Sequence, residues 1–116
     1  MSTILEDIKT LVEVDAEEDI YDAQLLLIIN GGIAYLRNNG VPLSRIDKNA
    51  TISDWPKLSE DDYPVVIDWL NYRVLQNFDR TLMLSYSANT TNNFIDYHMT
   101  DLLYQLKVRY EFNEVN

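Results

Sequence analysis

The stretch from about Glu18 to Asn38 constrains the fold of this 116-residue chain more than any other part of its sequence. Its apolar residues recur at steps of three and four, which is the spacing of an α-helix, and they form two stripes. A helix that is apolar on most of its sides needs neighbours on several faces, so we expect it to lie at the centre of the domain. The first stripe comprises Ile20, Ala23, Leu27, Gly31, Ala34 and Tyr35, and the second Leu26, Ile29, Ile33 and Leu36.

Two adjacent glycines, Gly31 and Gly32, fall in the middle of this helical pattern. Each costs about 1 kcal/mol relative to alanine in a helix interior. Glycines at such positions indicate either a second helix that crosses at close backbone distance or a kink. Asn39-Gly40 and Pro42 are typical of a helix end, and they stop the pattern there.

Three more segments have the helical period, from about Ser2 to Val12, from Glu60 to Asp79 and from Asn93 to Phe112. Ser2 or Thr3 is suited to cap the first of these helices, since a short hydroxyl side chain accepts a hydrogen bond from a free backbone N–H. These segments, with the one described above, predict a chain that is mostly helical.

Two shorter patterns concern the ends of these helices. Ser59, followed three residues later by Asp62, resembles a capping box with Asp in place of Glu. Strands are weakly signalled, and only the run from Thr81 to Ser87 has the composition of a short one.

The connection over residues 41–58 is longer than most loops, and loops of that length are usually functional or disordered. Its apolar content does not suit a flexible linker, so we expect it to pack either on its own domain or on a partner. The apolar residues of this loop are Leu43, Ile46, Ile52, Trp55 and Leu58.

Together these patterns predict an all-α fold, a small bundle of about four helices with a long loop between the second and the third. The length suits a single helical domain over residues 1–116 and leaves no room for two.

Charge narrows the range of partners. Nine basic and nineteen acidic residues give a formal net charge of −10. The basic residues are scattered, which argues against a nucleic-acid groove and against a patch for anionic membranes. Residues 1–22 hold eight acids and one lysine, a net charge of −7. Such a stretch is ordinary solvated surface, and it also suits a surface that meets a basic partner or lines a passage and repels DNA.

Residues with catalytic or metal-binding chemistry are sparse. There is no cysteine and one histidine, His98, with Asp101 three residues later. Two such ligands do not complete a zinc site. No serine stands in a sharp-turn nucleophile motif, and no glycine-rich phosphate loop is present. We therefore expect no enzyme activity, no metal and no cofactor, and a hydrolase that uses His98 is the least favoured hypothesis.

The sequence shows neither a membrane-spanning run nor a secretory signal. The longest apolar run, Leu25 to Ile29, has five residues, whereas a bilayer span needs about 18. Acidic residues stand where a secretory signal would carry basic ones. We expect a protein that works in the cytosol, or where a cytosolic product is later assembled, without a membrane partner.

Eight tyrosines are unusual for a domain of this size. Tyrosine combines a large apolar face with a polar tip and is favoured at protein interfaces. The last helix carries aromatic residues on more than one face, which a small monomer cannot easily cover. We expect at least three of the tyrosines to serve an interface.

The order of these segments resembles the head–tail connector proteins of long-tailed bacteriophages, also called head-completion or adaptor proteins. The likeness spans about residues 3–80. It is carried by a short acidic helix (TILEDIK, 3–9), by DAQLLLIINGGIAYLRN (22–38) and by DYPVVIDWLNYRVLQNFD (62–79). The paired glycines and the length of the 41–58 loop depart from the pattern of that family.

The resemblance implies a structural subunit of the virion that is assembled in the host cytoplasm. Such subunits form a ring, commonly of twelve copies, below the portal protein. The ring extends the DNA channel, through which DNA passes without specific binding, and offers a docking surface to a stopper or tail component. By this resemblance the C-terminal segment would meet the portal, and the 41–58 loop would meet a neighbour or the stopper. The interface residues expected are Leu43, Ile46, Ile52, Trp55, Tyr104, Lys107, Arg109, Tyr110 and Phe112.

A small acidic helical binding protein, such as a regulator or a DNA mimic, is the alternative hypothesis. The acidic residues 1–22 would then be the active surface, and Glu17, Glu18 and Asp19 would contact the basic partner.

Overall fold

The computed structural model describes residues 2–12, 19–77 and 88–114. Over these ranges the chain forms four α-helices and two short 3-10 helices and contains no strand, which confirms the all-α prediction. The run from Thr81 to Ser87 lies outside the described residues. In chain order the elements are α1 (Ile4–Leu11), α2 (Asp22–Asn38), η1 (Ile52–Asp54), η2 (Glu60–Asp62), α3 (Tyr63–Asn77) and α5 (Ala88–Glu114).

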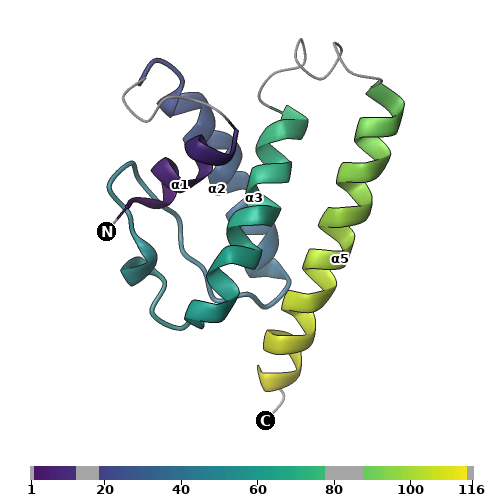
Figure 1. Cartoon of the computed structure of the whole chain (residues 1–116). Coiled ribbons are helices and arrows are strands. Elements are labelled where there is room, and N and C mark those ends of the chain that lie inside the picture. Colours follow the sequence, from purple (N-terminus) through teal and green to yellow (C-terminus); the bar gives the residue numbers. More distant parts are fainter. Residues whose placement is uncertain (1, 13–18, 78–87, 115–116) are drawn as a thin grey trace.

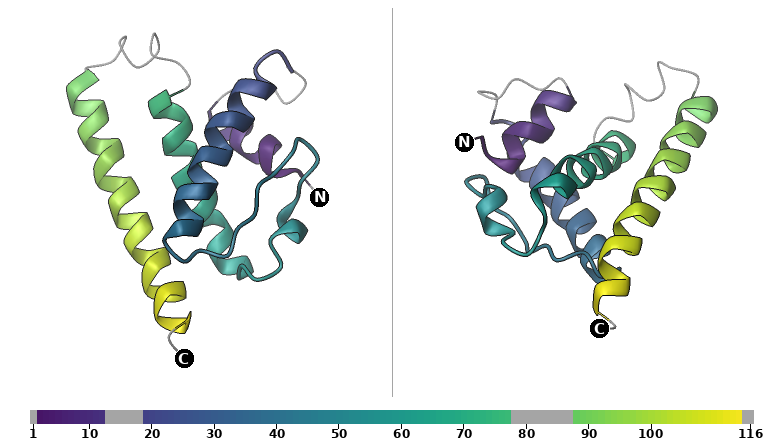
Figure 2. Two further views of the ribbon diagram at one scale, coloured as in Figure 1. Left: turned by 180° about the vertical axis from the view of Figure 1, so that it is seen from behind. Right: turned by 60° about the horizontal axis from the view of Figure 1, so that its bottom comes forward.

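The central helix is α3, which contacts α1, α2 and α5. Figures 1 and 2 show α3 between α2 on one side and the long α5 on the other. The inward face of α3 bears Val66, Leu70 and Val74, all fully buried, as its helical period predicts.

The prediction that α2 lies at the centre of the domain is wrong. The second stripe is mostly buried, with Ile29, Ile33 and Leu36 almost fully covered and Leu26 partly so. The other stripe faces solvent, since Ile20 is 72% exposed and Leu27 is 77% exposed. The reason is geometric: in the described part of the chain α2 packs mainly on α3 and on the loop that follows it, and these neighbours cover only one face.

Gly32 allows α3 to cross α2 closely. A Cβ atom placed on Gly32 would lie 2.7 Å from Cδ of Arg73 and 2.9 Å from Cδ2 of Leu70. Such distances are shorter than ordinary van der Waals contact, so this glycine is required by the packing. The helix that crosses at Gly32 is therefore α3, and it contacts this glycine through side chains. Gly31 is exposed, and its added Cβ would meet only the tip of Arg73, at 3.4 Å.

The short helix α1 is held at both of its ends. A capping box closes the start: Thr3 Oγ1 accepts the N–H of Glu6 at 3.1 Å, and Glu6 Oε1 accepts the N–H of Thr3 at 3.3 Å. Near its end, buried Lys9 forms an ion pair with Asp22 of α2. In between, the Tyr63 hydroxyl donates to Asp7 Oδ2 at 2.5 Å and joins α1 to α3.

The loop between α2 and η2 packs on its own domain. Trp55 is 1% exposed, and its indole N–H donates to the carbonyl of Ser44 at 2.8 Å. The Asn30 side chain holds the loop against α2, because it accepts the N–H of Ile46 at 2.8 Å and donates to the Ile46 carbonyl at 3.0 Å. The sequence allowed this loop to pack either on its own domain or on a partner, and in the structure it packs on its own domain.

Candidate protein–protein interface

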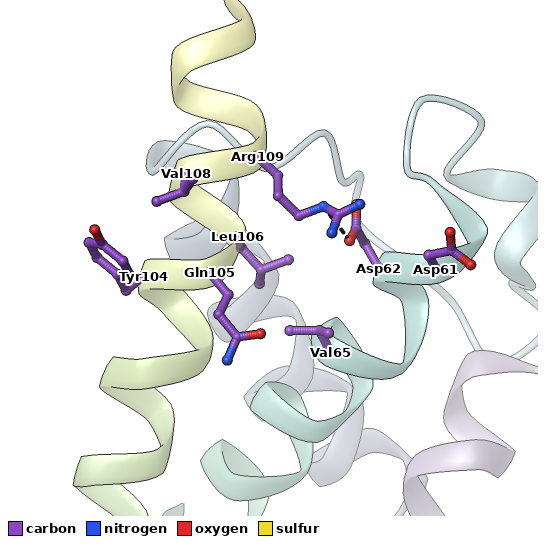
Figure 3. A pocket seen from close by; sticks show the side chains of 8 residues that line it. All are labelled: Asp61, Asp62, Val65, Tyr104, Gln105, Leu106, Val108 and Arg109. Atoms are coloured by element: carbon purple, nitrogen blue, oxygen red, sulfur yellow. Dashed lines mark ion pairs between the residues drawn. The ribbon is translucent and has the colours of Figure 1, made fainter.

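The C-terminal half of α5 is attached to η2 by a buried carboxylate. Asp62 is 2% exposed, and its Oδ1 lies 2.7 Å from Nε of Arg109. The Tyr110 hydroxyl donates to Asp62 Oδ2 and accepts the backbone N–H of Ser59 at 3.1 Å. Figure 3 shows Arg109 reaching from α5 toward Asp62. The Ser59–Asp62 capping box is therefore wrong in part: Ser59 caps η2 by accepting the N–H of Asp61, but Asp62 bonds to α5.

This arrangement favours a neutral Tyr110. Burial raises the pKa of its hydroxyl above the usual value, and the hydrogen bond to Asp62 raises it further. A neutral hydroxyl can donate to the carboxylate, so the hydrogen bond between Tyr110 and Asp62 persists over the physiological pH range. The attachment fixes which face of α5 is turned to the subunit.

The opposite face of α5 carries large side chains in solvent. Tyr97 is 74% exposed and Tyr104 is 68% exposed, and Val108 is also exposed. Their spacing of seven and four residues places them on one stripe of the helix, with Asp101 between the tyrosines. Figure 3 shows Tyr104 and Val108 pointing away from α3. We call the residues Tyr97, Asp101, Tyr104 and Val108 the α5 stripe.

A second exposed apolar surface lies along α2. Leu27 projects from it, and the neighbouring positions carry small residues, so that a groove runs beside Leu27. Two arginines border it, Arg37 at the end of α2 and Arg45 from the loop. We call the surface formed by Ala23, Leu27, Gly31, Ala34, Arg37 and Arg45 the α2 groove.

The sequence-predicted interface residues divide into two groups. Leu43, Ile46 and Trp55 are buried in the domain's own core, so in the single subunit they have almost no surface left for a partner. The loop folds back because its apolar side chains complete a core that the described helices leave open. Ile52 is half-buried.

The predicted residues of the last helix remain nearer the surface. Tyr104 is exposed, Lys107 is partly buried, and Arg109 keeps about half of its side chain in solvent. Tyr110 is half-buried against Asp62. The side chain of Phe112 lies outside the described residues.

Sequence reasoning did not select Tyr97, Val108 and Leu27 as interface residues. The aromatic residues on several faces of the last helix were a usable signal for Tyr97. Leu27 gave none, because periodicity alone does not say which of two apolar stripes on α2 is covered.

The single histidine, His98, packs against aromatic rings. His98 stacks on Tyr72 with ring centroids 5.7 Å apart and meets the edge of Tyr97 at 5.9 Å. Among the described residues no group of three metal-binding side chains comes together. In the same part of the chain, no helix combines the length and apolar character that crossing a membrane requires.

Comparison with protein families gives a match to a family described as phage connector protein, over residues 4–113. Neither the curated proteins nor the solved structures contain a match to the chain.

Proposed function

The chain belongs to the phage connector protein family, and on this premise we propose that it is a head–tail connector subunit that forms a ring beneath the portal. The family makes it a structural component of the virion. In the proposed role the ring extends the DNA channel of the portal and docks the stopper or tail component on its other side.

The observation that carries this proposal is the pair of uncovered apolar surfaces. The α5 stripe and the α2 groove lie on different helices of one small domain, and each presents a large apolar side chain that is about three-quarters exposed, Tyr97 and Leu27. Exposed apolar side chains that are grouped along one helix face mark interaction sites more often than side chains scattered singly. Two different surfaces per subunit suit a heterologous interface, which closes into a ring when the rotation between copies allows it.

Charge supports the channel role. The chain has a net charge of −10, and DNA moving through a ring of such subunits meets a lining of its own sign. Like charge prevents adhesion to the wall. We assign the contact with portal to the C-terminal end of α5, which carries Lys107, Arg109 and Phe112.

The direct test uses the purified chain with the portal protein encoded in the same phage genome. We expect co-migration of the two proteins and rings in electron micrographs of the complex. Full separation at every concentration would contradict the proposal.

A second experiment distinguishes the connector proposal from the alternative hypothesis of an acidic binding protein. Neutralising Glu17, Glu18 and Asp19 should leave ring formation intact. Loss of all binding in that variant would favour the acidic binding protein instead.

A further inference from the structure

We propose that the α5 stripe of one subunit seats in the α2 groove of the next copy of this chain. The inference rests on the proposed function, because it names the two surfaces by which a ring of these subunits would hold together. It commits to a second copy as the occupant of both surfaces.

The two surfaces cannot satisfy each other within one subunit. Asp62 holds the C-terminal half of α5 against η2 through Arg109 and Tyr110. Figure 3 shows Tyr104 and Val108 pointing away from that attachment. The groove belongs to α2, on the other side of α3 (Figures 1 and 2). Each subunit therefore offers a stripe on one side and a groove on another.

The spacing of the side chains on the two helices matches. Tyr97 and Tyr104 are seven residues apart, which is about 10 Å along a helix. In the groove, the small residues Ala23 and Gly31 stand on either side of Leu27 and are separated by about 12 Å. Two tyrosine rings of this separation can straddle Leu27, one over each small residue. This is the packing of ridges into grooves that helix pairs use.

The charges of the two surfaces are complementary. Asp101 lies between the two tyrosines on the stripe and is exposed. The groove contributes Arg45 near its middle, because Asn30 holds the adjacent Ile46 backbone by two hydrogen bonds. When the tyrosines straddle Leu27, Asp101 lies within about one helical turn of Asn30, beside which Arg45 is held, and the long arginine side chain can span that distance.

The α2 groove carries two arginines, Arg37 and Arg45, although the chain as a whole is acidic. Neither Arg45 nor Arg37 forms an ion pair within the described ranges 2–12, 19–77 and 88–114. A carboxylate from a neighbouring copy is a partner of suitable charge for them. Opposite charges at a docking surface select the correct partner and its register.

Cysteine pairs test the contact directly, because the natural chain contains no cysteine. Tyr104→Cys is combined with Ala23→Cys in one variant and with Gly31→Cys in another, and each is oxidised with and without portal protein. We expect a ladder of disulfide-linked multimers from one of the two, and the successful pair gives the direction of the helices. Tyr104→Cys with Asp68→Cys, an exposed position on α3, is the matched control and should give no such ladder.

Charge reversal provides a second measurement by sedimentation. Asp101→Arg and Arg45→Glu should each weaken self-association by about tenfold or more, and the double variant should regain most of it. Asp68→Arg makes the same charge change elsewhere and should have little effect.

The outcomes separate this inference from the proposed function. Rings on portal without a disulfide ladder from either pair, or without recovery in the double variant, would overturn the stripe-in-groove contact and leave the connector role standing. The absence of both rings and ladder would overturn both. Folding of every variant is checked by its circular dichroism spectrum, so that a lost ladder is not mistaken for a lost fold.

Discussion

The adjacent glycines of α2 provide a matched pair of variants, Gly31→Ala and Gly32→Ala, that tests the packing of α2 on α3. Either alanine gains about 0.5–1 kcal/mol of helix stability. At Gly31 the new methyl group meets only Nη2 of Arg73 at 3.4 Å, so the gain should appear in full. We expect Gly31→Ala to be more stable than the natural chain.

At Gly32 the same methyl group has no room. It would lie 2.9 Å from Cδ2 of Leu70 and 3.1 Å from Cζ3 of Trp69, and both of these side chains are buried. Overpacking of a core typically costs about 1–3 kcal/mol. The gain in helix propensity is common to the two variants, so their free energies of unfolding should differ by about 1–3 kcal/mol, with Gly32→Ala the less stable.

Urea denaturation followed by circular dichroism measures this difference, and thermal melting should separate the variants by roughly 4 °C or more. Each measurement is repeated at two protein concentrations, because self-association would stabilise the folded state by mass action. If Gly32→Ala proved as stable as Gly31→Ala, the close crossing of α2 and α3 would be refuted.

Two further predictions concern single side chains. Trp55→Ala should lower the free energy of unfolding by about 3–5 kcal/mol, because it leaves a cavity and removes the donor from the Ser44 carbonyl. A melting temperature near that of the natural chain would contradict the buried position of Trp55. Tyr63→Phe should cost about 1 kcal/mol near neutral pH through loss of the hydrogen bond to Asp7. Burial, followed by that hydrogen bond, raises the pKa of Tyr63 above its ordinary value. The stability that the neutral Tyr63 hydroxyl contributes is complete below pH about 10, the pKa of an unfolded tyrosine, and is lost as the pH rises further. The difference in free energy of unfolding between the natural chain and Tyr63→Phe should therefore narrow in urea titrations at alkaline pH. A gap that widened with pH would contradict the assignment.

Much of the local structure is readable from the sequence, because it depends on neighbours along the chain. The cap of α1 by Thr3, the end of α2 before Pro42 and the inward stripe of α3 follow from spacing and side-chain chemistry. A helical period places residues on one face whatever that face meets. The four helices, and the resemblance that agrees with the family match, come from this level.

The candidate interface was only partly readable. Tyr104 is exposed as expected, whereas Trp55 is buried, although both were predicted to serve partners. An apolar residue in a long loop has two possible destinations, its own core or another protein, and composition does not distinguish them.

What the sequence determined by itself is therefore the set of helices and the presence of more apolar surface than one face of each helix needs. Only the tertiary structure decided which surface is spare: that α3 rather than α2 is central, that Leu27 faces water, and that Asp62 bonds to a tyrosine far along the chain. The reason is that periodicity is a local property, while burial depends on contacts between residues distant in sequence, and those contacts exist only after the helices have packed.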